Sequence, residues 1–221
     1  MIPINTLLGA YSQGFFPMAV EGRIGWFSPE RRGILPIDGL HVPRRLQRVL
    51  RRGRFRGTTN RAFPAVIAAC AERPGEGTWL DAELIASYTA LHEAGHAHSI
   101  EVWQGDRLAG GLYGVSLRGA FFGESMFHTV TDASKVALCL LVERLRRRGY
   151  RLLDIQWLTA HLARFGAVEV PRRRYLALLA AALAADCRFT ARPRGPRPQP
   201  DGVRGPGGRR SGGRRPARDP N

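Results

Sequence analysis

The chain has 221 residues, a hydrophobic fraction of 44% and a formal net charge of +16 at pH 7. These values predict a globular protein with one sizeable core, and no segment approaches the roughly 18 consecutive apolar residues of a membrane span. The N-terminal segment MIPINTLLGAYSQGFF lacks the charged region and cleavage site of a secretory signal, and the three distant cysteines (Cys70, Cys139, Cys187) suggest no disulfide framework. We therefore expect a cytoplasmic protein without a membrane partner.

The positive charge is unevenly distributed. Residues 192–221 contain nine Arg and two Asp, a net charge of +7, which leaves +9 for residues 1–191. The segment 192–221 is rich in Pro, Gly and Arg and poor in apolar residues, so we predict that it is disordered. It is either a solvated tail or a segment with non-specific attraction to RNA. A charge of +9 on the remainder favours a polyanionic partner, with phosphate as the obvious group.

The first part of the chain shows short elements, which we interpret as a small N-terminal α/β domain over residues 1–60. The predicted elements are a helix over 4–14 ended by Gly14, a turn over 15–18, strands over 24–28 and 33–37, and a helix over 42–53. The last helix has Leu46, Val49 and Leu50 on its expected inner face and arginines on the other.

The following residues, 61–191, predict a second domain of α+β class with one central sheet. The expected order is helices over 61–72 and 81–95, three strands over 98–104, 107–117 and 119–127, a long helix over 133–149, a strand over 151–156, a short helix over 159–166, a strand over 167–170 and a helix over 171–186. Short Gly-containing turns separate the three consecutive strands, which therefore predict an antiparallel meander.

Residues 92–96, HEAGH, match the H-E-x-x-H pattern of zinc proteases. That site requires both histidines on one face of a continuous helix. Gly95 is a typical residue to end the helix that begins near Asp81, so His96 is expected in the turn that follows. We therefore reject a zinc site here, interpret these histidines as part of a helix-to-strand corner, and expect no metal.

Polar residues within apolar strands are the candidates for chemistry. Glu124 lies in FFGESMF, and its carboxylate is either paired with a ligand or turned outward. Asp154 and Gln156 lie two apart in LLDIQWL, so a regular strand places both on the same face. A carboxylate and an amide there can orient a nucleophile and bind a reacting carbonyl, or they form a structural hydrogen-bonded pair.

The order of elements is similar to that of GNAT acyltransferases, but a glycine-rich loop for pyrophosphate is absent before the long helix, where the sequence is FHTVTDASKVAL. Nucleophile-elbow and P-loop motifs are also absent. The acyl donor is therefore expected to be something other than coenzyme A.

Eight sequence blocks occur in the same order and at similar spacing as in one enzyme family. They are AYSQGFFPM (10–18), WFSPERRG (26–33), TWL (78–80), LHEAGHAHSIEVW (91–103), GGLYGVSLRGAFFGESMF (110–127), ASKVAL (133–138), LLDIQ (152–156) and HLARFGAVEVPRRRYL (161–176). Over residues 8–180 the chain thus resembles the leucyl/phenylalanyl-tRNA–protein transferases. The resemblance implies a GNAT-like catalytic domain and transfer of Leu, or Phe or Met, from aminoacyl-tRNA to proteins whose N-terminal residue is Arg or Lys. The product would carry an N-terminal degradation signal.

The resemblance also implies roles for individual residues. Asp154 and Gln156 match the catalytic pair, in which Gln156 would contact the attacking α-amine and the ester, and Asp154 would orient Gln156 or the acceptor's basic residue. Trp79 matches the residue that stacks on the terminal adenine, Glu124 the carboxylate beside the aminoacyl-adenosine, and Met18 a second adenine contact. A pocket for the aminoacyl side chain is expected from apolar residues, each of which is alternatively a core residue. These residues are Leu112, Phe121, Met126, Leu138, Leu145 and Leu153.

No cofactor is expected, and the resemblance suggests a monomer. The basic helix is either a phosphate-contacting face for tRNA or a solvated surface helix; its arginines are Arg44, Arg45, Arg48, Arg51 and Arg52. The alternative to an enzyme is a non-catalytic tRNA- or RNA-binding protein of GNAT-like fold, which the Asp154–Gln156 pair argues against.

Overall fold

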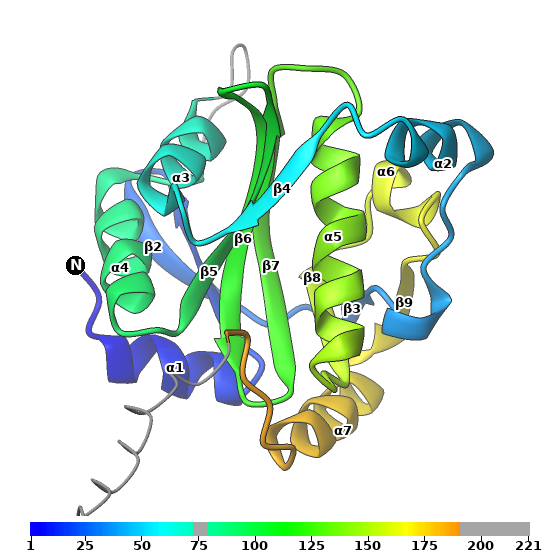
Figure 1. The fold of residues 1–221 in the computed structure, drawn as a ribbon. Coiled ribbons are helices and arrows are strands. Elements are labelled where there is room, and N and C mark those ends of the chain that lie inside the picture. Colours follow the sequence, from blue (N-terminus) through cyan, green and yellow to red (C-terminus); the bar gives the residue numbers. More distant parts are fainter. Residues whose placement is uncertain (73–78, 191–221) are drawn as a thin grey trace, which may run out of the picture. The chain divides into compact units, whose positions relative to one another are not determined.

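The computed structural model describes residues 1–72 and 79–190 (Figure 1). The predicted disordered segment 192–221 lies outside the described residues. The main sheet has seven strands in the order β4-β5-β6-β7-β8-β3-β9. Their bounds are β3 Arg31–Ile34, β4 Arg56–Thr59, β5 Ala97–Gln104, β6 Arg107–Leu117, β7 Ala120–His128, β8 Leu152–Gln156 and β9 Val168–Pro171. Neighbouring strands are antiparallel except for β7 and β8, which are parallel.

The α+β class and the predicted meander are therefore confirmed. Strand β5 pairs with β6 and β6 with β7, as their alternation and short turns predict. The chain then crosses from β7 to β8 through the long helix α5 (Ala133–Arg147), which produces the parallel pair. Such a crossover is the usual way to connect parallel neighbours, because a hairpin turn cannot do so.

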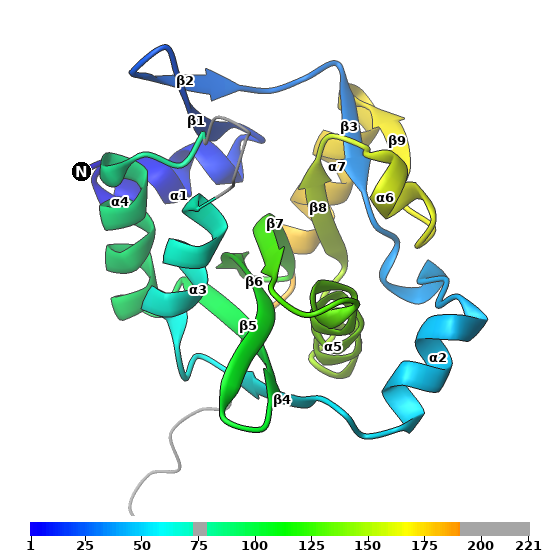
Figure 2. The same cartoon turned by 90° about the horizontal axis from the view of Figure 1, so that it is seen from above.

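Helices cover both faces of the sheet (Figure 2). Strand alternation turns Tyr113, Val115 and Phe122 toward one core, and Leu112 and Phe121 toward the other. The first core contains buried residues of α1 (Ile4–Ser12), α3 (Phe63–Ala71), α4 (Ala82–Glu93) and α7 (Arg172–Leu183). The second contains buried residues of α5 and of α2 (Arg44–Arg51).

The N-terminal region differs from the prediction in its strands. The expected turn over 15–18 is wrong, because Phe16–Val20 forms strand β1, which pairs with β2 (Arg23–Phe27) in a separate two-stranded sheet. Strands β3 and β4 precede residue 60 and pair into the main sheet. The predicted division at residue 60 remains a prediction. A helical turn η1 (Ile37–Gly39) and the short helix α6 (Ala160–Ala163) complete the described elements.

The helix over 42–53 is confirmed, but its inner face is narrower than predicted. Leu46 is buried at 3% exposure, whereas Leu50 is exposed at 37%. Val49 is partly buried and packs against the same core as Leu46. The five arginines of 44–52 are exposed as expected.

The histidine-rich corner also follows the prediction. Helix α4 ends at Glu93, Gly95 has a φ of +81°, and the backbone N–H of His96 donates to the carbonyl of Leu91 at 2.8 Å. A positive φ favours glycine, so this residue ends the helix between the two histidines. His92 contacts the carbonyl of Ala97 through Nδ1 at 2.8 Å, which ties the helix end to β5.

Within the residues that the structure describes, no helix has both the length and the apolar character required to cross a membrane.

Candidate active site

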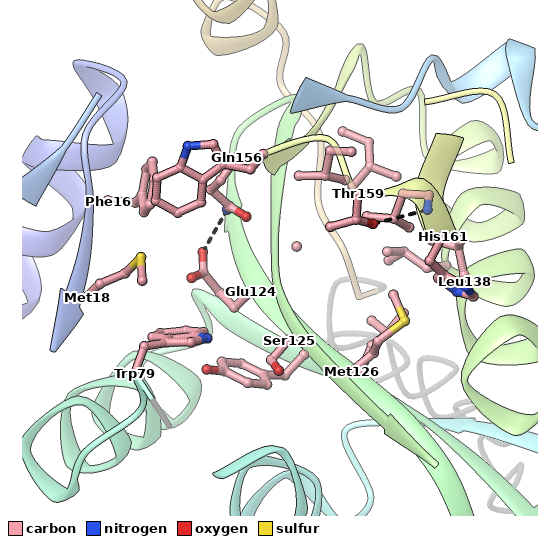
Figure 3. A pocket seen from close by; sticks show the side chains of 18 of the residues that line it. Phe16, Met18, Trp79, Glu124, Ser125, Met126, Leu138, Gln156, Thr159 and His161 are labelled. Carbon is pink, nitrogen blue, oxygen red and sulfur yellow. Dashed lines mark hydrogen bonds between the residues drawn. The ribbon is translucent and has the colours of Figure 1, made fainter. Parts of the chain in front are cut away.

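The site arises where two parallel strands separate. The register of β7 with β8 covers three pairs and ends at Phe122 opposite Asp154, after which β8 continues beside β3. A pocket of about 650 Å³ opens beyond this point (Figure 3). Gly123 on β7 and Gln156 on β8 both line it. Residues of both strands therefore face one cavity at the point where the strands separate, which is a common location for a ligand site.

Three hydrogen-bond donors surround Glu124 at this pocket. The hydroxyls of Tyr11 and Tyr88 donate to its carboxylate oxygens at 2.8 and 3.0 Å, and the amide of Gln156 donates at 3.5 Å. Burial raises the pKa of Glu124 to about 7, although the tyrosine hydrogen bonds oppose the shift. The sequence left open whether the Glu124 carboxylate faces a ligand site or turns outward. The structure shows Glu124 lining the pocket, so it does not turn outward.

Asp154 lies behind the pocket and is fully buried. Its carboxylate accepts hydrogen bonds from Arg32 at 2.7 and 2.9 Å, from the Tyr175 hydroxyl at 2.6 Å and from the backbone N–H of Gln156 at 2.8 Å. Arg32 is 1% exposed and also donates to the carbonyl of Gly14 at 3.0 Å. Burial is the largest single influence on the pKa of Arg32 and lowers it, but Asp154, together with Tyr175 and Glu124, raises this pKa overall, so the guanidinium stays charged.

Gln156 has a φ of +58°, in the left-handed region. The expected alternation therefore breaks at this residue, and Asp154 and Gln156 do not project together from a regular strand. Leu153, Ile155 and Gln156 all line the pocket, while Asp154 binds the Gln156 backbone from behind. A non-glycine residue in this conformation costs about 1–3 kcal/mol, which the Asp154 hydrogen bond helps to offset. The Asp154 carboxylate thus fixes the backbone of Gln156, which carries the side-chain amide at the pocket.

The nucleobase contacts predicted from the resemblance lie at one end of the pocket. Met18 on β1 and Trp79 both line the cavity, and Figure 3 shows them beside Glu124. The backbone N–H of Ala19 donates to the Trp79 carbonyl at 3.0 Å, which ties β1 to the segment that carries the indole. Met18 and Trp79, which are 61 positions apart in the chain, are thereby brought to one edge of the pocket.

The other end of the pocket is mainly apolar, with Thr159 and His161 beside Leu138 (Figure 3). Four of the six predicted side-chain residues line it: Leu112, Met126, Leu138 and Leu153. The structure does not bring Phe121 and Leu145 to the cavity, because both are fully buried in the core between the sheet and α5. Phe121 stacks on Phe189 at 5.1 Å instead.

Several residues that line the pocket were not predicted from the sequence. They are Phe16, Pro17, Tyr113, Gly123, Ser125, Leu141, Ile155, Trp157, Thr159, His161 and Leu162. The spacing of Leu141 after Leu138, one helical turn along α5, could have identified it. Trp157, beside the predicted Gln156, was a second available signal. Arg32, the partner of Asp154, lies 122 residues away, and no local pattern links the two.

A smaller cavity of about 130 Å³ lies between α2, α5 and α6. It is lined by Arg45, Lys135, Arg164 and His161 with Asp132, and His161 also lines the main pocket. Burial, and then the charges of Lys135, Arg164 and His128, lower the pKa of His161. The basic helix α2 therefore adjoins the rim of the main pocket.

No group of three metal-binding side chains is found among residues 1–72 and 79–190. His98 stacks on Phe189 at 4.4 Å and contacts Asn60 at 2.9 Å. It therefore packs against the core that contains Phe189, on the opposite side of β5 from His92. Burial is the main cause that lowers the pKa of His98 to about 3.

Comparison with known proteins gives a consistent result. The family model described as leucyl/phenylalanyl-tRNA protein transferase matches residues 34–180, and the model of its N-terminal domain matches residues 2–30. A leucyl/phenylalanyl-tRNA–protein transferase from Ruegeria pomeroyi is 50% identical over 193 residues, covering 86% of this chain and 91% of the relative.

Two further relatives carry the same name. The protein from Gloeobacter violaceus is 53% identical, covering 83% of this chain and 95% of the relative. The protein from Anaeromyxobacter dehalogenans is 56% identical, covering 80% and 78%. Among solved structures, the structure of L-PGS from Bacillus licheniformis aligns with a TM-score of 0.40 at 13% identity, over 69% of this chain and 53% of that chain. That score is too low to relate the two folds.

Proposed function

The chain belongs to the leucyl/phenylalanyl-tRNA–protein transferase family, and we propose that it transfers Leu, or Phe or Met, from aminoacyl-tRNA to the N-terminal Arg or Lys of acceptor proteins. The product carries a new peptide bond and an N-terminal degradation signal. The observation that carries this proposal is that one pocket combines an indole at Trp79, polar groups at Glu124 and Gln156, and apolar side chains around Leu138.

The pocket fits an aminoacyl-adenosine in its parts. We assign Trp79 and Met18 to the adenine, Glu124 to the region of the ester, and Leu112, Met126, Leu138 and Leu153 to the aminoacyl side chain. An apolar pocket excludes charged side chains, but one methylene is worth only about 1–3 kcal/mol. We therefore expect weak discrimination among Leu, Phe and Met.

The reaction is the attack of the acceptor α-amine on the ester carbonyl carbon. The C–N bond forms, the bond to the ribose oxygen breaks, and the amine proton passes to that leaving oxygen. An amide is a very weak base, so Gln156 contributes by orienting the amine and the ester rather than by taking the proton. Asp154 acts through Gln156, because its carboxylate accepts a hydrogen bond from the Gln156 backbone N–H at 2.8 Å.

We test the function by incubating the protein with labelled Leu-tRNA and a peptide that begins with Arg. Label on the peptide is expected. Unlabelled peptide together with intact RNA binding would contradict the transferase and favour the non-catalytic RNA-binding alternative.

The role of Gln156 is tested by Gln156→Ala. Transfer is expected to fall about 100-fold, the usual loss when one positioned hydrogen-bond donor is removed, while Leu-tRNA affinity is retained. Gln104→Ala is the matched control, because Gln104 is a half-exposed amide at the end of β5, outside the pocket lining. Equal activity of both variants would contradict the assignment. Asp154→Ala is a poorer test, since it leaves Arg32 buried without its carboxylate.

Several finer assignments complete the proposal. The parallel β7–β8 pair joined by α5 supports a GNAT-like catalytic domain. The exposure of the α2 arginines beside the pocket rim supports their role in tRNA phosphate contacts. Dependence on charged tRNA supports a cytoplasmic location. A monomer, without a cofactor, remains our expectation.

A further inference from the structure

An aromatic surface lies at the mouth of the pocket, directly after the proposed positioning amide. Trp157 follows Gln156, lines the pocket and is 41% exposed. Its indole meets Phe16 edge-on at 4.9 Å and an interplanar angle of 85°, and Phe27 at 6.2 Å and 63°. Two strands of the N-terminal hairpin thus hold the indole beside the reacting groups, although neither buries it.

The carboxylates near the pocket are already engaged. Glu124 is the one acidic residue among the described lining residues, and it accepts from Tyr11, Tyr88 and Gln156. Asp154 is buried and bound to Arg32 and Tyr175. A cationic group that enters this pocket therefore finds little free negative charge, and the basic body of the protein repels it.

An electron-rich ring offers a different partner for a cation. Tryptophan is the strongest of the aromatic side chains in this respect, and guanidinium groups use it more often than ammonium groups. The same aromatic cluster already holds one guanidinium, since Arg32 lies 4.5 Å from the ring centre of Phe16 and 4.6 Å from that of Tyr175. The outer indole of the cluster is available for a second.

We propose that the Trp157 indole is the subsite for the cationic side chain of the acceptor's N-terminal residue, with Arg preferred over Lys. This inference rests on the transferase function proposed above. Gln156 and Trp157 line the same pocket, so the indole is available to the side chain of an acceptor whose α-amine is oriented by Gln156. Recognition by a ring rather than a carboxylate also suits a planar guanidinium, which stacks on an aromatic face.

The test is steady-state transfer from Leu-tRNA to peptides that begin with Arg or Lys. For Trp157→Val, the KM for the Arg peptide is expected to rise about 5- to 30-fold, from the usual strength of a cation–π contact. The kcat and the KM for Leu-tRNA are expected to stay within threefold. Trp157→Phe keeps a weaker ring and should recover most of the loss. Trp26→Val is the matched control, because Trp26 on β2 is similarly exposed, at 39%, and lies outside the pocket lining.

The alternatives give different results. A rise in the KM for Leu-tRNA alone would mean that the indole stacks on a nucleobase, and would overturn the proposal. An active wild-type protein with unchanged Trp157→Val kinetics would overturn it too, while leaving the transferase function intact. A wild-type protein that transfers nothing would overturn the function and this inference with it. A Trp157→Phe variant as impaired as Trp157→Val would show that packing, rather than the ring, matters, and would contradict the proposal.

Discussion

At the scale of single residues, the two carboxylates of the site are stabilised in different ways. Asp154 pairs with the buried Arg32 guanidinium, so its negative charge is balanced. Glu124 relies mainly on neutral donors, the hydroxyls of Tyr11 and Tyr88. Burial therefore raises the pKa of Glu124 to about 7 and makes its ionised form costly in the folded protein.

This difference predicts a pH dependence of stability. Because the folded-state pKa of Glu124 is raised, the folded protein binds the proton more tightly than the unfolded chain between pH 4.5 and 7. The free energy of unfolding of the wild type, relative to Glu124→Gln, should therefore fall by about 3 kcal/mol as the pH rises through this window. Chemical denaturation at several pH values measures it. A constant difference between the two proteins would contradict the raised pKa.

At the scale of elements, the approach of β3 to β8 determines where the site lies. Strand β3 pairs with β8 on one side and β9 on the other, with an irregular register between Gly33 and Ile34. A Cβ atom on Gly33 would lie 2.8 Å from the backbone of both Trp157 and Leu158. Glycine at this position therefore permits the left-handed Gln156 and places Trp157 at the pocket.

Gly33→Ala is consequently expected to destabilise the protein by about 1–3 kcal/mol, because backbone atoms must move to accept the methyl group. Transfer should fall as well, since the shifted segment carries Gln156. Gly9→Ala is the control: nothing lies within 4 Å of a Cβ there, and alanine favours the helix α1. Thermal unfolding and transfer assays on both variants measure the effects. Equal behaviour would show that the close approach is unimportant.

At the scale of the whole molecule, positive charge is placed beside the pocket as well as in the segment 192–221. Helix α2 exposes Arg44, Arg45 and Arg48, and Arg45 reaches the small cavity that shares His161 with the main pocket. A tRNA whose 3′ end occupies the pocket would thus meet arginines at the rim. Affinity for a polyanion depends on released counterions, so this charge has a measurable signature.

The double variant Arg44→Gln/Arg48→Gln should reduce the steepness of log affinity for tRNA against log salt concentration by up to about 2, from 0.7–0.9 for each lost phosphate contact. Arg173→Gln/Arg174→Gln on α7 is the matched control, because these arginines are also exposed but belong to another helix. Binding titrations at several salt concentrations measure the slopes. Identical slopes in the two double variants would contradict a specific role of α2.

The sequence by itself determined the local elements and the list of candidates. Periodicity predicted helices α1 to α5 and the meander, since these depend on neighbouring residues and on glycines such as Gly95 and Gly149. The motif resemblance predicted the family, and eight of the eleven residues assigned to aminoacyl-adenosine binding, the side-chain pocket or catalysis line the cavity: Met18, Trp79, Leu112, Glu124, Met126, Leu138, Leu153 and Gln156.

Only the tertiary structure decided how these residues act. Three contacts join segments that are far apart in the chain. They are the ion pair of Arg32 with Asp154, the backbone hydrogen bond between β1 and Trp79, and the edge-on aromatic contact of Phe16 with Trp157. Local periodicity contains no information on such pairs, because they form when strands pair across the sheet. The left-handed Gln156 likewise depends on Asp154 and on the close approach of Gly33. The two-residue spacing of Asp154 and Gln156 predicted a shared face, whereas the packed sheet places the carboxylate behind the amide.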